Sequence, residues 1–129
     1  LIEQMLASID GEVRGRVAEH AKLAQRYRLR LAGYEGGAHD ASSFFPADKQ
    51  DRMTALFASA HRHPRMRDVY RRYYETWIEA GGAVLNQYND IGRWSKWGLW
   101  SVLEHVTQDP ASAPKYQALL ETIAAHPAP

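Results

Sequence analysis

Apolar residues recur at helical spacing through the first part of the chain. They fall three, four or seven residues apart, at Ile2, Leu6, Ile9, Val13, Val17 and Ala24. This spacing places the apolar side chains on one face of an amphipathic helix, which we predict from about Ile2 to Tyr27. Gly11 and Gly15 each weaken its middle by roughly 1 kcal/mol relative to alanine. A break near Asp10 and Gly11 is therefore compatible with the sequence.

The apolar period changes between Arg28 and Tyr34, where a short strand is predicted. Gly36-Gly37 ends this strand, and residues 38–46 have the composition of a loop. One helix is predicted over residues 47–63, ended by Pro64, and the next ends at Gly81-Gly82. Their buried faces are expected to hold Met53, Leu56, Phe57 and Ala60 in the first helix, and Met66, Val69, Tyr70, Tyr73 and Trp77 in the second.

A second strand is predicted at residues 83–88, which begin apolar and become polar, as a parallel barrel strand does toward its active-site end. A loop with two tryptophans follows at residues 89–99, and Pro114 suits the first position of a last helix. The buried face of that helix is expected to be Tyr116, Leu119, Leu120 and Ile123. Strands alternating with helices predict an α/β fold with parallel βα units.

Composition narrows the classes of function. The chain of 129 residues has 16 basic and 15 acidic residues and a net charge of +1, so no long-range field favours nucleic acid or an anionic membrane. No apolar run approaches the roughly 18 residues of a membrane span, and no signal peptide is visible. Cysteine is absent, which excludes disulfides, cysteine–zinc sites and thiol catalysis. No cofactor is predicted.

Four segments of the chain resemble, in order, the last part of a retaining (β/α)8-barrel glycoside hydrolase. Residues 31–37 (LAGYEGG) resemble the seventh strand of that group, and residues 80–88 (AGGAVLNQY) resemble the passage into the eighth. Residues 97–104 (WGLWSVLE) resemble the segment after that strand, and residues 113–119 (APKYQAL) resemble the start of the closing helix. The motifs are short, but together they run over nearly the whole chain.

The resemblance implies that residues 1–129 are a single partial domain, the C-terminal βα units of a helix-rich TIM barrel, with strands seven and eight and their flanking helices. It implies a retaining hydrolase of a β-linked poly- or oligosaccharide, in which Glu35 attacks the anomeric carbon. The acid/base residue of the family lies on the fourth strand, outside this chain. The isolated chain is therefore expected to be inactive. The implied activity favours a secreted or periplasmic location.

The start of the chain at Leu1, inside a helical pattern, also leads us to expect a piece whose N-terminal part is missing. A closed barrel needs eight strands and about 250 residues, whereas two parallel strands leave bare edges and a bare inner face. We therefore expect the isolated chain to be partly unfolded, to form homo-oligomers, or to pair with the missing part of the barrel.

Glu35 is the candidate catalytic residue on chemical grounds as well. A nucleophilic carboxylate must be held rigidly and must be approachable by a sugar ring, and the end of a strand holds it rigidly. The two glycines that follow remove side chains that would block a substrate. Tyr34 could orient a neighbouring carboxylate, although strand alternation points it away from Glu35. The simpler alternative is that Glu35 is a solvated turn residue.

The candidate sugar-binding residues lie near the two strand ends. Asn86 and Tyr88 belong to a polar cluster at the second strand's end, where amides and hydroxyls suit sugar hydroxyls. Three indoles, Trp94, Trp97 and Trp100, follow within seven residues and could stack on sugar rings, Trp94 or Trp97 being favoured for the cleft. Core packing is the alternative for each of them. His39 and Asp40 could line the same rim.

Two other charged groups are interpreted as structural. His61-Arg62-His63 lies at a helix end without a convergent carboxylate, so no metal site is predicted there. The arginines of the next helix, Arg65, Arg67, Arg71 and Arg72, are expected to be solvated and paired with Asp68 and Glu75.

Two alternatives to a hydrolase remain open from the sequence. One is a non-catalytic carbohydrate-binding protein that uses the cluster of Trp94, Trp97 and Trp100. The other is a helical interaction domain in which Glu35 has no role. Neither alternative involves nucleic acid or a membrane.

Overall fold

The computed structural model describes residues 1–127 and contains the two predicted strands as a parallel pair. Strand β1 (Ala32–Gly36) and strand β2 (Val84–Gln87) pair Ala32 with Val84 and Gly33 with Leu85. The register then shifts by an irregularity before Gly36 pairs with Gln87. The α/β class and the parallel βα order predicted from the sequence are thus confirmed.

The first helix contains the break that the glycines predicted. Helix α1 (Ile2–Ser8) continues into a π-helical turn, η1 (Ile9–Val13), and then into α2 (Arg14–Arg26). A π turn accommodates one extra residue without ending the helix, and it falls on Asp10 and Gly11. Ile9, within this turn, is buried in the core.

Helices α3 (Ala47–Arg62) and α4 (Met66–Glu79) follow the predicted bounds, with Pro64 between them. Met66, Val69 and Tyr70 of the predicted core face of α4 are buried, and Tyr73 and Trp77 are half-buried, while Tyr74 is buried without having been predicted. The predicted face of α3 is wrong in one respect. Leu56 is 52% exposed, because the helix turns Phe57, Ala58 and His61 inward instead.

The last helix, α5 (Pro114–Ala125), begins at Pro114 as predicted, after a short 3-10 turn, η2 (Pro110–Ser112). Its predicted buried face is right for Tyr116 and Leu119, which pack against the core, and wrong for Leu120 and Ile123, which are exposed. Helix α5 packs against α4 through a face that contains the buried Lys115 and Ala118. Alanine lets the helices approach closely, and the polar end of Lys115 is satisfied in the interior, as described below.

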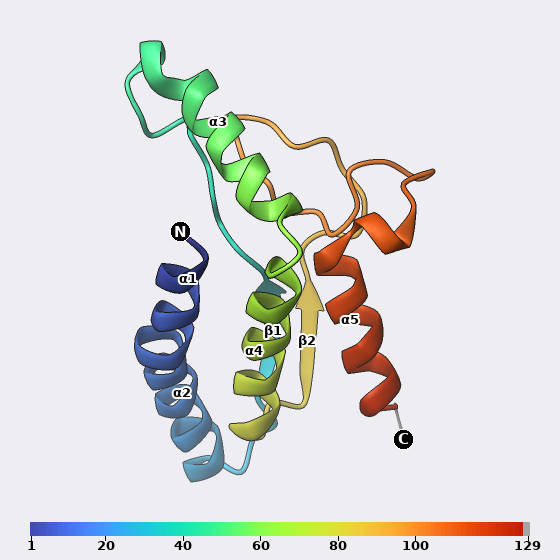
Figure 1. The fold of residues 1–129 in the computed structure, drawn as a ribbon. Coiled ribbons are helices and arrows are strands. Elements are labelled where there is room, and N and C mark those ends of the chain that lie inside the picture. The colour runs from blue at the N-terminus through green and yellow to red at the C-terminus, as the bar shows by residue number, and fades with distance from the viewer. Residues whose placement is uncertain (128–129) are drawn as a thin grey trace.

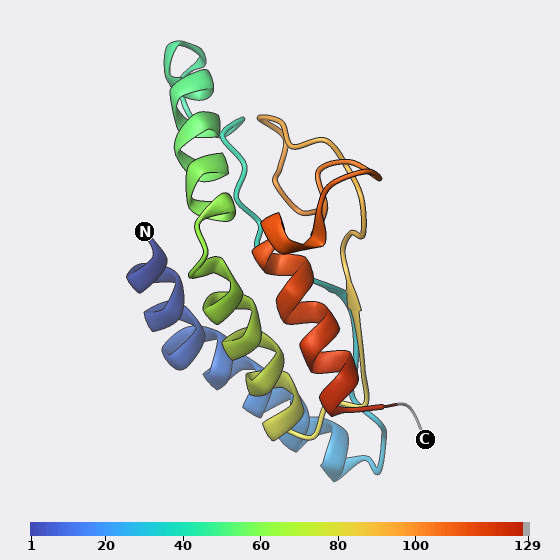
Figure 2. The same cartoon turned by 45° about the vertical axis from the view of Figure 1, so that its right-hand side comes forward.

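Helices α2, α4 and α5 run beside one another on one side of the sheet (Figure 2), whereas α3 extends beyond the carboxyl ends of the strands (Figure 1). Leu85 of β2 and Gly33 of β1 face α4, where they meet Trp77 and Tyr73. Alternation along the strands therefore directs Tyr34 and Val84 to the opposite side, where they are 86% and 46% exposed. Within residues 1–127 this second face of the sheet has no covering layer.

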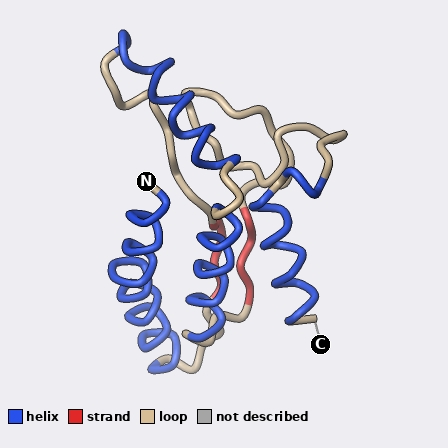
Figure 3. The backbone as a smooth tube through the Cα atoms, in the orientation of Figure 1, coloured by secondary structure: helices blue, strands red, loops and turns tan. Residues whose placement is uncertain are grey.

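The long connections gather at one end of the strands. Residues after β1 and after β2 run as loops beside α3, at the carboxyl ends of both strands (Figure 3). Ligands of parallel α/β folds bind at this end, because the loops that follow the strands converge there. No helix within residues 1–127 is long and apolar enough to cross a membrane.

Candidate functional site

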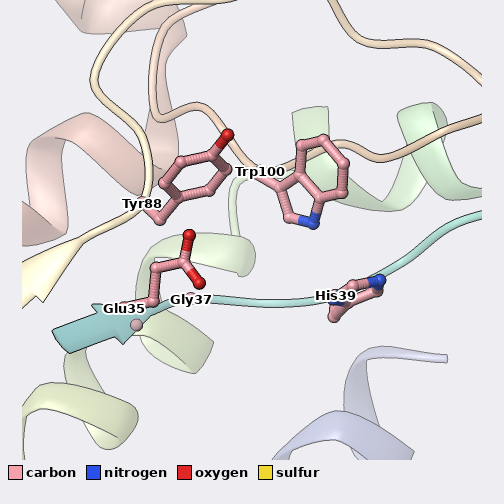
Figure 4. Close-up of a pocket in the computed structure, with 6 residues that line it drawn as sticks. Glu35, Gly37, His39, Tyr88 and Trp100 are labelled. Carbon is pink, nitrogen blue, oxygen red and sulfur yellow. The ribbon is translucent and has the colours of Figure 1, made fainter. Parts of the chain in front are cut away.

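A pocket of about 320 Å³ lies at the carboxyl ends of β1 and β2. Its lining comes from the end of β1, from the loop that follows it and from the segment after β2, and consists of Glu35, Gly36, Gly37, His39, Tyr88 and Trp100. Figure 4 shows the Glu35 carboxylate directed toward the ring of Tyr88, with Trp100 and His39 on the far side. The pocket therefore contains three predicted site residues, Glu35, His39 and Tyr88.

Two glycines follow Glu35 because side chains do not fit there. A Cβ atom at position 36 would lie 2.5 Å from the hydroxyl oxygen of Tyr73. Gly37 has a φ of 132°, and a Cβ there would lie 2.6 Å from Nε2 of Gln87. The backbone after Glu35 can thus run close to α4 and β2, which leaves the space in front of the carboxylate open.

The aromatic wall of the pocket consists of edge-on contacts around Trp100. The ring of His39 lies 5.6 Å from the Trp100 indole at 77°, and the ring of Tyr88 lies 5.7 Å from it at 66°. These contacts join the loop after β1 to the segment after β2. The wall presents polarisable ring atoms and a phenol to whatever enters the pocket.

The Glu35 side chain is exposed, and within residues 1–127 no hydrogen bond or ion pair engages its carboxylate. The carboxylate is the only acidic group among the pocket's described lining residues. Chemically, this pocket offers one carboxylate, one imidazole, one phenol and one indole. That combination can bind a polar ligand with an apolar face.

Four of the predicted sugar-binding residues lie outside this lining, and Trp94 among them is described separately below. Tyr34 projects from the uncovered face of the sheet, and Asn86 is exposed on β2. Trp97 is 63% exposed on a tight turn, where the ammonium group of Lys96 lies 5.0 Å from its ring centroid. The structure does not bring these side chains together with Glu35, and their contact with a sugar stays a prediction.

Trp94, favoured from the sequence for the cleft, takes a different place. Its Nε1–H donates to the backbone oxygen of Ser101 at 3.2 Å and to its hydroxyl at 3.0 Å. Its ring meets the ring of His61 edge-on at 5.5 Å. The indole therefore packs beneath the loops, and Trp100 takes the position in the pocket.

A polar chain beneath the pocket was missed by the sequence interpretation. His61 is completely buried, and its Nε2 lies 2.7 Å from Oδ2 of Asp40. On the other side of the ring, Nδ1 lies 3.1 Å from Nζ of Lys115, which donates at 2.7 Å to the backbone oxygen of Leu99. The expectation that no carboxylate converges on this histidine is therefore wrong, because Asp40 turns inward from the rim.

These contacts fix the direction of each hydrogen bond. In its ammonium form Lys115 can only donate, so Nδ1 of His61 is then the acceptor, and Nε2–H of the neutral ring donates to Asp40. Burial lowers the pKa of Lys115 to about 7, and the charges of Asp40 and Glu104 oppose that effect. Burial also lowers the pKa of His61, against the hydrogen bond with Asp40. A neutral His61 fits both neighbours.

Helical spacing could have revealed this chain. His61 lies four residues after Phe57, on the buried face of α3, and Lys115 lies three residues before the fully buried Ala118 of α5. Only the inward direction of the Asp40 side chain could not be predicted from the sequence, because Asp40 lies in a loop without periodicity. Residues 1–127 contain no group of three or more histidine or acidic side chains that could hold a metal ion.

The four arginines at Arg65, Arg67, Arg71 and Arg72 are solvated and paired as predicted, but the predicted partners Asp68 and Glu75 are right only for Arg65 and Arg71. Arg71 lies 3.8 Å from Asp68 and 3.6 Å from Glu75, whereas Arg67 pairs with Glu121 of α5 and Arg72 with Asp10 of η1. These ion pairs connect exposed helix surfaces and lie away from the pocket.

Comparison of the chain with models of known protein families found no match, and searches of curated proteins and of solved structures found no protein with significant similarity. The site is therefore interpreted from its own geometry and chemistry.

Proposed function

We propose that the pocket at the ends of β1 and β2 is the sugar-binding centre of a retaining glycoside hydrolase, with Glu35 as the nucleophile. The observation that carries this proposal is the convergence of Glu35, His39, Tyr88 and Trp100 at the carboxyl ends of two parallel strands. Indoles and phenols stack on the C–H faces of sugar rings, while a carboxylate can attack the anomeric carbon.

The proposal places the two strands at positions seven and eight of a (β/α)8 barrel. Helices α2, α4 and α5 cover one face of the sheet, and the face that carries Tyr34 and Val84 lies uncovered, as the inner face of a barrel would before the other strands are added. The substrate is a β-linked poly- or oligosaccharide. The general acid belongs to another strand, because the pocket's lining holds a single carboxylate.

The nucleophile can be tested without its acid. A 2-deoxy-2-fluoro-β-glycoside with a dinitrophenolate leaving group needs no protonation, because dinitrophenolate departs unaided. The carboxylate oxygen forms a bond to C1 as the bond from C1 to the phenolate oxygen breaks, and the fluorine slows the later hydrolysis. The reagent is offered in gluco, xylo and manno forms to the polypeptide that carries these residues, and labelled peptides are identified by mass spectrometry.

We expect one fluoroglycosyl group on Glu35, none in Glu35→Gln, and unchanged labelling in the matched control Glu19→Gln. Glu19 is an exposed glutamate on α2, far from the pocket in the fold. Labelling of a different carboxylate, or of none, would remove Glu35 from the role of nucleophile.

A second candidate function is carbohydrate binding without hydrolysis. The observation that favours it is the same single carboxylate, because a pocket with one acidic group and an aromatic wall suffices for binding. The same preparations are run through gels that contain cellulose, xylan or mannan. Retention in a gel without labelling of Glu35 would support this second function.

A further inference from the structure

The buried chain Asp40–His61–Lys115 spans the two loops that form the pocket's aromatic wall. Asp40 directly follows His39, which lines the pocket. At the other end of the chain, Lys115 donates to the backbone oxygen of Leu99, which directly precedes Trp100. His61, from α3, stands between Asp40 and Lys115.

We propose that Asp40, His61 and Lys115 act as a positioning strut, which holds the loop of His39 and the segment of Trp100 at the separation that forms the pocket. The strut goes beyond the proposed function because it assigns a role to three residues that do not line the pocket of Glu35. It rests on that function only in treating the pocket as a ligand site.

The strut is built from three different parts of the chain. Asp40 comes from the loop after β1, His61 from the last turn of α3 and Lys115 from the first turn of α5. The side chains of His61 and Lys115 are 0% and 1% exposed, so water does not replace their hydrogen bonds. The hydrogen bonds of this chain are buried at His61 and Lys115 and half-buried at Asp40, so breaking them leaves buried polar groups unpaired, and the chain restrains the relative position of the elements it joins.

The wall of the pocket lacks such a connection of its own. His39 and Trp100 meet only ring edge to ring face at 5.6 Å, a contact without the directional constraint of a hydrogen bond. The loops are also joined by a bond from Ser43 N–H to the oxygen of Lys96 at 2.9 Å, which lies several residues from Trp100. The two ends of the strut, Asp40 and Leu99, are the sequence neighbours of His39 and Trp100.

The charges that face Lys115 come from several elements. Asp40 and Glu104 lie on loops, His61 lies on α3, and the Tyr70 ring on α4 lies 5.6 Å from Nζ. Trp94 covers the same ammonium group at 4.5 Å from its ring centroid. Because neutral and protonated lysine both donate hydrogen bonds, the strut does not require Lys115 to be charged.

The experiment uses fluorine NMR of the whole chain with 5-fluorotryptophan at its four tryptophans. The Trp100 resonance is assigned by Trp100→Phe. We expect Lys115→Met to shift this resonance and to weaken any glycan retention roughly tenfold, because a misplacement of about 1 Å in a site is enough for such a loss.

Arg62→Met is the matched control. Arg62 also lies over Trp94, at 5.3 Å from its ring centroid, but its own ion pair joins it to Glu104 and not to the strut. Both variants are expected to shift the Trp94 resonance. Only Lys115→Met should shift that of Trp100, and an equal shift of Trp100 in both variants would overturn the proposal.

A second pair of variants separates the strut from a general loss of stability. At pH 8, Asp40→Asn still offers an oxygen to Nε2–H of His61 and should keep the Trp100 resonance near its original position, whereas Asp40→Ala should shift it. If the resonance is the same in Asp40→Ala as in the unaltered chain, the strut is wrong.

The strut and the proposed function fail in different ways. A shifted Trp100 resonance in Lys115→Met supports the strut even where no glycan is retained by any variant, and that second result counts against the proposed function alone. If Lys115→Met and the unaltered chain retain glycan equally and share the same Trp100 resonance, the strut is overturned and the proposed function stands.

Discussion

Lys115 has a long cationic side chain of which 1% is exposed, and its surroundings decide how it titrates. Burial lowers its pKa to about 7, well below the ordinary value of 10.5 that applies in the unfolded chain. Between these two values the unfolded chain binds more protons than the folded one. Stability must therefore rise with pH through this window, and it must be lost as the pH falls toward 7.

This linkage gives a prediction for the free energy of unfolding. From pH 7 to pH 10, the stability of the unaltered chain relative to Lys115→Met should increase by at most about 1.4 kcal/mol per pH unit. Urea unfolding of both proteins at a series of pH values measures the difference, in which the other titrating groups cancel. A difference that falls with rising pH would show that Lys115 gains protons on folding.

Single residues of the site were predictable where a strand end set their place. Glu35 lies near the end of β1, His39 lies in the loop after it and Tyr88 directly follows β2, and the structure brings them into one pocket. Which of the three tryptophans enters the pocket was not predictable, because they lie in a loop, where residue spacing does not determine the direction of a side chain. There the turn between Ser95 and Gly98, and the bonds from Trp94 to Ser101, decide which indole points inward.

At the scale of elements, the sequence pattern located the α-helices and both strands within residues 1–127, with α1 and α2 predicted as one helix, but it misplaced part of two helix faces. Leu56 on α3 and Leu120 on α5 were expected to be buried and are exposed. In both helices the inward face carries a polar side chain, His61 or Lys115, whose burial depends on partners from distant segments. An apolar pattern alone cannot reveal such a face, because the hydrogen bonds that permit its burial are tertiary.

Alanine substitutions at Gly11 and at Gly37 are expected to change the stability of the protein in opposite directions. A Cβ at Gly11, in the π turn, would have no atom within 4 Å, so Gly11→Ala should raise stability by about 0.5–1 kcal/mol by restricting the unfolded chain. Gly37→Ala should lower it, because of the φ of 132° and the nearby Gln87 side chain. Thermal melts of the two variants test this pair, and a lower Tm for Gly11→Ala would contradict the reading of the π turn.

At the scale of the whole molecule, residues 1–127 form two layers, with helices on one face of a two-stranded sheet. The uncovered face and the outer edges of β1 and β2 offer backbone groups and side chains to further strands. The barrel context, and pairing with a missing part or a second copy, stay predictions from the sequence. What the structure adds is that the candidate pocket forms within residues 35–100.

The strut also has a consequence for the order of folding. The contact between Asp40 and His61 spans 21 residues of sequence, whereas that between His61 and Lys115 spans 54. Closing the longer loop costs more chain entropy, so the helices should form before α5 docks and completes the pocket. Lys115→Met should then speed unfolding and leave the folding rate unchanged in stopped-flow experiments, while slower folding would contradict this order. A nascent chain would accordingly carry formed helices well before it could bind a ligand.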